Sequence, residues 1–183
     1  MTAAQPSLPP CLLAIDQGTP STRVLAVTPS QSIVASHQIG LQQHYPASGW
    51  VEHDADDIWT AVCVCLKEVL TAIKGRYTPL AVGITNQRET CLLWERATGK
   101  PACRATVWQD RRTASLCEEL ARREGFAARI TRQTGLLLDP YFSATKLAWL
   151  LDDPAGPKLR TQAEAGALCF GTIESYLTYR LTA

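Results

Sequence analysis

A short polar segment near the start of the chain holds side chains suited to binding phosphate oxygens. Gly18 permits a positive φ and close approach of a ligand to the backbone, and the hydroxyls of Thr19 and Ser21 can donate hydrogen bonds. Arg23 adds positive charge, and the Asp16 carboxylate could hold a hydrated Mg²⁺. An ordinary β-hairpin would use the same glycine and hydroxyls for its turn alone, so the local sequence favours both interpretations about equally.

Charged and aromatic side chains occur again at the predicted ends of later elements, where ligand-binding groups commonly lie. Arg88 and Glu89 follow a predicted buried strand, and they could grip two atoms of a small polar ligand or form an exposed ion pair. Trp108 could wall a carbon chain or lie in the core. Asp110 could be a general base, but two arginines follow it, which favours an ion pair. Tyr141 could present its hydroxyl to a ligand or simply be packed.

Composition and charge exclude other classes of protein. The 183 residues, 46% of them hydrophobic, can bury the core of one domain. A formal net charge of +1 leaves no excess of Lys and Arg for a nucleic-acid backbone. Neither a Gly-x-x-x-x-Gly-Lys loop nor a Gly-x-Gly-x-x-Gly segment after a strand is present. Residues 1–10 lack a basic region and the apolar stretch after them is short, so we expect no signal peptide, no membrane span and a cytoplasmic protein.

The seven cysteines are expected to be reduced and structural. Their number is odd, no Cys-x-x-Cys is present, and no histidine lies at metal-ligand spacing. Most lie in apolar runs, where a free cysteine behaves as a small buried residue. They are Cys11, Cys63, Cys65, Cys91, Cys103, Cys117 and Cys169.

The first polar segment needs a strand on each side of it. Apolar runs at Cys11–Ile15 and Val24–Val27 predict that pair, and Ser32–Leu41 predicts a third, antiparallel strand. A loop is expected over residues 42–54, followed by a helix that ends near Lys74. The apolar face of this helix consists of Ile58, Val62, Cys65, Leu66, Val69 and Ile73.

The second half of the chain is predicted to be mainly helical. A fourth strand at Pro79–Thr85 leads into Arg88 and Glu89, and a hairpin with a long turn joins Thr90–Trp94 to Ala102–Trp108. Strands followed by a helix, a further strand and more helices indicate an α/β fold with a mixed sheet, its first three strands antiparallel, covered by helices. Further elements are expected as helices at 112–124, 127–134, 143–151, 158–165 and 173–181, with a short apolar run at 167–170.

Several segments occur together in an order typical of one family. The chain resembles the amino-terminal lobe of the glycerol kinases, a branch of the FGGY family of carbohydrate kinases, from residue 12 to residue 182. The resemblance implies a ribonuclease-H-like, actin-like ATPase fold. The segments that carry it are Asp16-Gln17-Gly18-Thr19, Gly49-Trp50-Val51-Glu52-His53-Asp54, Gly83-Ile84-Thr85-Asn86-Gln87-Arg88-Glu89-Thr90, Val107-Trp108-Gln109-Asp110-Arg111-Arg112-Thr113, Asp139-Pro140-Tyr141-Phe142-Ser143-Ala144-Thr145-Lys146 and Phe170-Gly171-Thr172.

The resemblance implies a substrate and a reaction. The small molecule would be glycerol, and the γ-phosphoryl group of ATP would pass to its terminal hydroxyl to give sn-glycerol 3-phosphate. Arg88, Glu89 and Tyr141 match positions that hydrogen-bond the glycerol hydroxyls, and Trp108 matches a position that packs on its carbons. Such catalysis relies on positioning and charge neutralisation.

The resemblance also implies roles for the first polar segment. Thr19, Ser21 and Arg23 match positions that contact the nucleotide phosphates, and Asp16 matches the acid beside Mg²⁺. Pro20 departs from the pattern, because the family usually places Ser or Thr at this cofactor-binding position. Proline lacks both a hydroxyl and a backbone N–H, so weaker nucleotide binding is expected.

The expected domain organisation is a flexible N-terminus at 1–10 and a kinase amino-terminal domain at 11–183, with the second lobe outside this chain. The family's general-base aspartate would also lie beyond residue 183, so the polypeptide alone is expected to lack useful kinase activity. A non-catalytic glycerol- or polyol-binding module, and a lobe of another polyol or sugar kinase of the family, remain alternatives. The resemblance further allows a homodimer or tetramer for the full-length protein.

Overall fold

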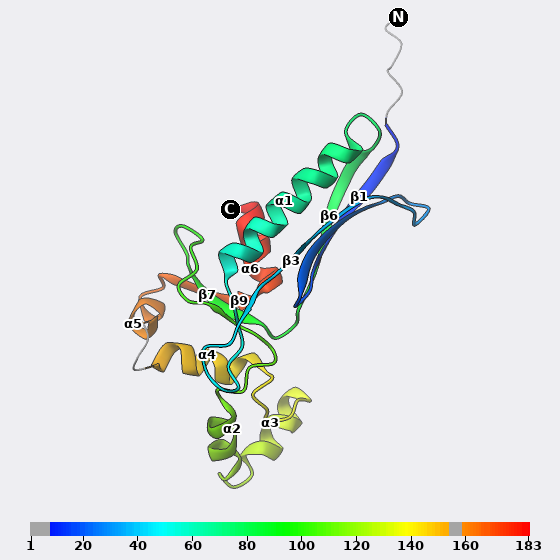
Figure 1. Ribbon diagram of the computed structural model, residues 1–183. Coiled ribbons are helices and arrows are strands. Elements are labelled where there is room, and N and C mark those ends of the chain that lie inside the picture. The colour runs from blue at the N-terminus through cyan, green and yellow to red at the C-terminus, as the bar shows by residue number, and fades with distance from the viewer. Residues whose placement is uncertain (1–7, 154–158) are drawn as a thin grey trace, which may run out of the picture. The chain divides into compact units, whose positions relative to one another are not determined.

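The computed structural model describes residues 8–153 and 159–183, and its internal contacts divide into two compact units. The first unit contains the residues up to Gln42 together with Asp56–Asn86, and the second contains Gln43–Ala55 with Gln87–Ala183. The expected flexible N-terminus falls mostly on residues 1–7, which lie outside the described part of the chain. Figure 1 shows the elements in chain order.

The first unit is built on a four-stranded mixed sheet with the order β3-β2-β1-β6. β1 pairs antiparallel with β2, and β2 pairs antiparallel with β3, as the sequence predicts. β6 pairs with β1 in the parallel direction, which the intervening helix makes possible. The strands are β1 (Pro10–Gln17), β2 (Ser21–Val27), β3 (Ile33–Gly40) and β6 (Thr78–Asn86).

Helix α1 (Ala55–Ile73) provides the other half of this unit's core. Its predicted apolar face is buried except for Leu66, which is half-buried. The Cys65 thiol donates to the backbone oxygen of Thr22 on β2, so this face of the helix lies against the sheet. Gly75 adopts a φ of 72° just after the helix, where a glycine avoids the strain of a left-handed conformation.

Strand β6 differs from the sequence-based expectation. The run Pro79–Thr85 was expected to be a buried strand, yet Leu80 and Val82 are 67% and 51% exposed. The reason is its place in the sheet, because β6 lies at an edge and has only β1 as a neighbour within the described residues. Apolar composition therefore predicted the strand correctly and its burial wrongly.

The second unit contains a five-stranded sheet with the order β4-β5-β8-β7-β9. Two of its strands lie in the segment expected to be a loop, where Gln43 and His44 pair with His53 and Glu52. Two-residue strands leave no periodic pattern in a sequence, which explains why they were missed. The strands are β4 (Gln43–His44), β5 (Glu52–His53), β7 (Cys91–Glu95), β8 (Ala105–Thr106) and β9 (Leu168–Thr172).

The predicted hairpin after residue 90 is present in reduced form. β7 pairs with β8 only at Cys91 and Thr106, with an isolated bridge between Trp94 and Pro101. Pro101 cannot donate to a ladder, and β9 pairs with β7 along the whole length of β7. β9 occupies the opposite edge of β7 from β8, so β7 lies between the hairpin partner and a strand that comes much later in the chain.

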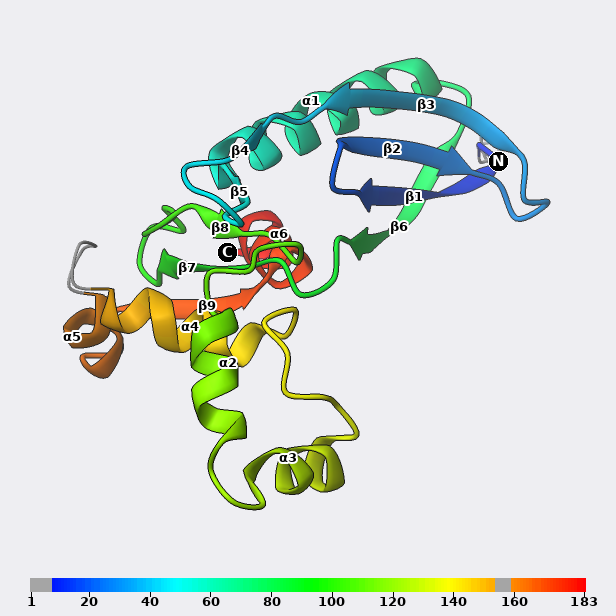
Figure 2. The same ribbon diagram turned by 60° about the horizontal axis from the view of Figure 1, so that its bottom comes forward.

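All five helices predicted for the second unit are present, with shifts of up to three residues at their ends (Figure 2). One hydrophobic cluster beside α4 and β7 consists of the buried side chains Leu93, Leu150, Leu159 and Leu168. None of the helices in the described residues is long and apolar enough to cross a membrane. The helices are α2 (Ala114–Ala121), α3 (Phe126–Thr134), α4 (Ser143–Asp152), α5 (Leu159–Glu164) and α6 (Ile173–Thr182).

Candidate functional site

The candidate site in the second unit is centred on Glu89, in the loop between β6 and β7. Its carboxylate accepts hydrogen bonds from the Ser143 backbone N–H at 2.9 Å and from the Ser143 hydroxyl at 2.7 Å. Both bonds end on Oε2, and Ser143 is the first residue of α4, where backbone N–H groups favour a negative charge. The Glu89 backbone has a φ of 65°, a left-handed conformation that is uncommon outside glycine.

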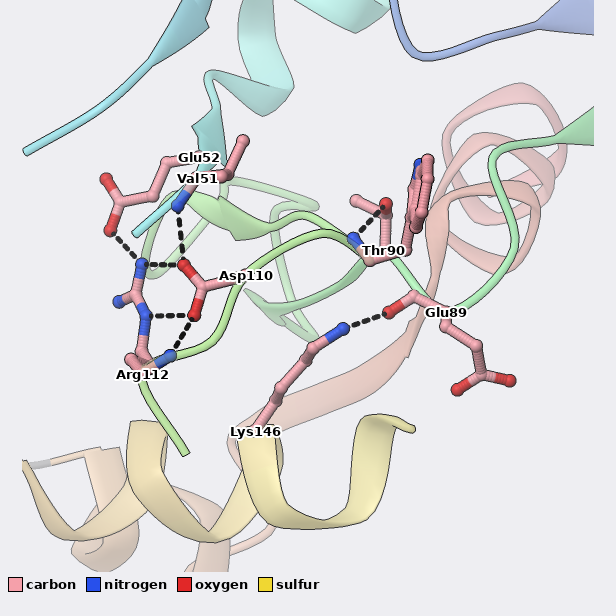
Figure 3. A network of polar contacts seen from close by, with 8 residues as sticks. Val51, Glu52, Glu89, Thr90, Asp110, Arg112 and Lys146 are labelled. Atoms are coloured by element: carbon pink, nitrogen blue, oxygen red, sulfur yellow. Dashed lines mark hydrogen bonds and ion pairs between the residues drawn. The ribbon is translucent and has the colours of Figure 1, made fainter. Parts of the chain in front are cut away.

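Lys146, one turn further along α4, reaches the same loop. Its ammonium group donates to the Glu89 backbone oxygen at 3.1 Å and to the Tyr141 backbone oxygen at 2.9 Å. Figure 3 shows the Glu89 backbone oxygen facing Lys146 while the carboxylate points away from it. Burial lowers the pKa of Lys146 below its ordinary value.

Trp108 and Tyr141 lie side by side in this unit. Their ring centroids are 6.1 Å apart with an interplanar angle of 66°, which is an edge-on arrangement. Trp108 is 36% exposed, so it is not the buried core residue that a tryptophan would be by default. The Thr90 hydroxyl accepts a hydrogen bond from the Trp108 backbone N–H at 3.1 Å, which ties Trp108 to the residue after Glu89.

Arg88 is the member of the predicted set that the structure does not bring into contact with the others. Its side chain is exposed, and in the described part of the chain no ion pair joins it to Glu89. The alternative of an exposed Arg88–Glu89 pair is therefore wrong. Glu89, Trp108 and Tyr141 are the predicted residues that the structure links together.

Asp110 is ion-paired, as the sequence favours. Its carboxylate accepts from Arg112 at 2.8 and 2.9 Å and from the Val51 backbone N–H at 2.6 Å, while Arg112 also reaches Glu52 at 2.8 Å (Figure 3). The Arg112 guanidinium lies over the Trp50 ring, 4.0 Å from its centroid. Both carboxylate oxygens of Asp110 are occupied, so this side chain holds the fold and is not available as a base.

The polar segment of the first unit is a tight hairpin between β1 and β2. The Gly18 N–H donates to the Ser21 backbone oxygen at 2.9 Å, so that donor closes the turn. The Ser21 hydroxyl accepts from Gln38 at 2.8 Å, which leaves the hydroxyl hydrogen to donate elsewhere. Pro20 is exposed and contributes no N–H. Neither Gly18 nor Pro20 therefore offers a backbone N–H to a phosphate bound at this turn.

Asp16 and Arg23 face each other across this hairpin. They form an ion pair at 2.8 Å, and both side chains are partly exposed. Among the residues that the structure describes there is no group of three or more His, Cys, Asp or Glu side chains placed to hold a metal ion. A hydrated Mg²⁺ needs few protein ligands, so a single exposed carboxylate fits an ion that keeps most of its waters.

Ser143 and Lys146 are the side chains that sequence reasoning missed at this site. Phe142 occupies the N-cap position of α4, and Ser143, the first residue of the helix, binds Glu89. Both residues belong to the segment Asp139–Lys146 that carries the family resemblance, which is the signal that could have identified them.

The predicted reduced cysteines agree with the structure, in which all seven are free.

Comparison with known proteins gives a consistent result. The model of the FGGY family of carbohydrate kinases, N-terminal domain, matches residues 11–183. The glycerol kinases of Chelativorans sp. and Alteromonas mediterranea are 54% and 52% identical to the chain over 172 residues, which cover 93% of this chain and 34% of each relative. The chain therefore spans about a third of the length of the curated relatives that it matches.

Solved structures show the same similarity in three dimensions. The crystal structure of Plasmodium falciparum glycerol kinase with ADP superimposes with a TM-score of 0.89 at 33% identity, covering 98% of this chain and 35% of that chain. Ligand-bound xylulose kinase from Lactobacillus acidophilus superimposes with a TM-score of 0.79 at 23% identity, covering 93% of this chain and 33% of that chain, which shows a shared fold. The predicted actin-like, mixed α/β fold class is thereby confirmed.

Proposed function

The chain belongs to the FGGY family of carbohydrate kinases, and we propose that it is the amino-terminal lobe of a glycerol kinase that transfers the γ-phosphoryl group of ATP to glycerol. The similarity to glycerol kinases at about half of all positions supports this choice of substrate. In this proposal residues 11–183 form the amino-terminal domain, and activity requires a second lobe.

One observation carries the proposal: an acceptor and an apolar wall are linked in the same unit. Glu89 is held through Oε2 by Ser143, so Oε1 can accept from a glycerol hydroxyl. The Trp108 ring, 6.1 Å from the Tyr141 ring, offers an apolar surface for the three carbons, and the Tyr141 hydroxyl offers a further polar contact. Arg88, exposed beside Glu89, would supply donors once a ligand is bound.

The hairpin of the first unit would bind the phosphates of ATP. Ser21, Thr19 and Arg23 provide side-chain donors there, and Asp16 would hold a hydrated Mg²⁺ through an outer contact. When bound, the ion supplies charge neutralisation for the transferring phosphoryl group. Since Asp16 is paired with Arg23, binding of Mg²⁺ and phosphate would replace that ion pair with two new ones.

The 183-residue polypeptide by itself is expected not to phosphorylate glycerol. Around the glycerol candidates the described carboxylates include Glu89, bonded to Ser143, Asp110, buried and bonded to Arg112, and Asp139, which accepts from the Tyr141 backbone N–H. Asp110 has both oxygens occupied, and a proton on Glu89 Oε1 would weaken the two bonds that Ser143 donates to the charged carboxylate, so neither is placed as a general base. A coupled ADP-release assay with ATP, Mg²⁺ and glycerol should give no glycerol-dependent signal, and normal turnover would refute this expectation.

Glycerol binding to the 183-residue polypeptide tests the proposal directly. Ligand-detected NMR at millimolar glycerol should show binding, and Glu89→Gln should weaken it by about tenfold, because a hydrogen bond to a charged acceptor contributes roughly 1–1.5 kcal/mol more than one to a neutral acceptor. Glu118→Gln, at an exposed position on α2, is the matched control and should leave binding unchanged. Equal affinities for all three proteins would contradict the assignment.

The alternative within the family is a lobe for a larger polyol or sugar. Xylitol and D-xylulose compared with glycerol in the same NMR experiment distinguish the two. Tighter binding of a five-carbon ligand than of glycerol would favour that alternative. Glycerol binding in a longer version that still shows no kinase activity would instead favour a non-catalytic binding module.

A further inference from the structure

Lys146 is buried in a way that stability alone does not explain. Its side chain is fully buried on α4, and its hydrogen-bond acceptors are two backbone oxygens, those of Glu89 and Tyr141. No ion pair within the described residues joins it to a carboxylate. Removing an ammonium group from water is costly unless an opposite charge compensates it, and here only neutral carbonyls do so directly.

The two carbonyls that Lys146 binds belong to two candidate glycerol ligands. Glu89 and Tyr141 lie on separate loops, one after β6 and one before α4, with 51 residues between them in the chain. A single ammonium group within 3.1 Å of both backbone oxygens fixes the distance between these loops. The carbonyl of Glu89 must turn toward Lys146 to make this bond, and Figure 3 shows that orientation.

The conformation of Glu89 adds a second, independent observation. Its φ of 65° costs on the order of 1 kcal/mol or more for a residue other than glycine, so the surroundings must hold it there. α4 does so from both ends of the residue, because Ser143 binds the carboxylate and Lys146 binds the backbone oxygen. If the backbone bond were lost, Glu89 could relax, and its carboxylate would leave Ser143.

We infer that Lys146 is a positioning residue, whose ammonium group holds the backbones of Glu89 and Tyr141 so that both side chains face one glycerol molecule. The inference rests on the proposed function of the site. Lys146 itself does not touch the substrate. It acts only through the two carbonyl groups.

The test compares the unaltered polypeptide with Lys146→Met, which keeps the length and apolar character of the side chain but has no donors. We expect the affinity for glycerol to fall at least tenfold in the NMR titration. We also expect the Ser143 amide, which donates to Glu89, to exchange its hydrogen at least tenfold faster relative to the Leu150 amide of the same helix. Lys100→Met, at an exposed position, is the control and should change neither quantity.

The two measurements separate positioning from simple support of the fold. A merely structural role would speed exchange equally at Ser143 and Leu150 and leave the affinity of the folded molecules unchanged, which would overturn the inference. Unchanged affinity with unchanged Ser143 exchange would overturn it as well. If the unaltered polypeptide binds no glycerol, the proposed function fails, while the exchange ratio still decides whether Lys146 fixes Glu89.

A second variant covers the case in which Lys146→Met does not fold. Lys146→Gln keeps an amide donor but is shorter and uncharged, so it can satisfy at most part of the same contacts. Its glycerol affinity should fall at least threefold, with faster exchange at Ser143 than at Leu150. Affinity and exchange equal to those of the unaltered polypeptide would contradict the inference.

Discussion

Loss of the Arg112 side chain would leave the buried carboxylate of Asp110 without its charged partner. The Arg112 side chain is buried, as is that of its partner Asp110, and its guanidinium lies against the rings of both Trp50 and Trp149. We expect Arg112→Met to lower the free energy of unfolding by about 3–5 kcal/mol, because removing one partner of a buried pair leaves the other uncompensated. Urea denaturation followed by tryptophan fluorescence measures this.

The control for Arg112 is Arg123, which makes an exposed ion pair with Glu119 on α2 at 3.2 Å. Both side chains of that pair are about three-fifths exposed, so Arg123→Met should cost less than about 1 kcal/mol. Similar decreases in the free energy of unfolding for the two variants would show that the buried ion pairs stabilise the fold no more than an exposed one.

His53 makes the stability depend on pH. It is 1% exposed, neither of its ring nitrogens has a hydrogen-bond partner within the described residues, and burial, with a smaller contribution from His44, lowers its pKa to about 4. In the unfolded chain its pKa is about 6.5, so between pH 6.5 and 4 the unfolded state binds more protons. The free energy of unfolding should therefore fall as the pH falls through this window, by at most about 1.4 kcal/mol per pH unit.

Urea denaturation at pH 7, 6 and 5 tests this dependence. His53→Phe removes the titrating group and should flatten the decline. His37→Gln, on β3 of the first unit, should retain it. A decline that is the same in His53→Phe would assign the effect to other groups.

Pro20 is expected to limit phosphate binding at the hairpin. Pro20→Ser adds a hydroxyl and a backbone N–H to an exposed turn, and it keeps the Pro20 carbonyl position that accepts from Leu41 at 2.9 Å. The affinity for tripolyphosphate with Mg²⁺ should rise about 3- to 10-fold, as one added hydrogen bond would give. Calorimetric titration measures it, with Pro29→Ser in the exposed β2–β3 turn as the control. No gain from Pro20→Ser would leave the proline without a role in affinity.

At the scale of elements, the turn after β7 is held against α6. Gly99 has a φ of 71°, and a Cβ there would lie 2.9 Å from Arg180 Cδ and 3.1 Å from Tyr179 Cε1. Gly166 has a similar φ of 72°, but nothing lies within 4 Å of its Cβ position. Gly166→Ala should cost about 1 kcal/mol for the backbone alone, and Gly99→Ala about 1–2 kcal/mol more because the side chains of Arg180 and Tyr179 must move aside. Equal costs in urea denaturation would show that Arg180 and Tyr179 move freely.

The regular elements could be predicted because each repeats a pattern over several turns or residues. The face from Ile58 to Ile73 on α1 and the strands on both sides of the first hairpin are examples. The pairings of β5 with β8 and of β7 with β9 could not, because they join segments distant in the chain. Whether a short segment forms a strand depends on the segments that it pairs with, and the local sequence does not indicate that pairing.

The candidate site divides in the same way. Glu89, Trp108 and Tyr141 were predicted because they follow or precede regular elements and match a family pattern. The bonds from Ser143 and Lys146 to Glu89 could not be predicted, since a lysine on an amphipathic helix is usually exposed. Side-chain identity indicated the chemistry, and only the fold showed which atoms meet.

At the scale of the whole molecule, the exposed edge strand β6 predicts self-association. Its apolar side chains Leu80 and Val82 are largely exposed, and such an edge is a template for another strand. We expect the weight-average molar mass from light scattering to rise with protein concentration, and Leu80→Lys to reduce that rise severalfold. Leu70→Lys, at an exposed position of α1, should have little effect because a helix offers no edge. An equal reduction by both variants would indicate a general effect of charge.

Glu89 places two opposed demands on one position, and this has a consequence for how such a lobe can drift. Its backbone, with a φ of 65°, favours glycine or asparagine, whereas the proposed contact with glycerol needs a long carboxylate. If the position no longer had to meet the proposed contact, replacement by Gly or Asn would relieve the backbone and end recognition, at the cost of the two bonds from Ser143. A lobe that had lost the proposed substrate would therefore be expected to tolerate Gly or Asn at position 89.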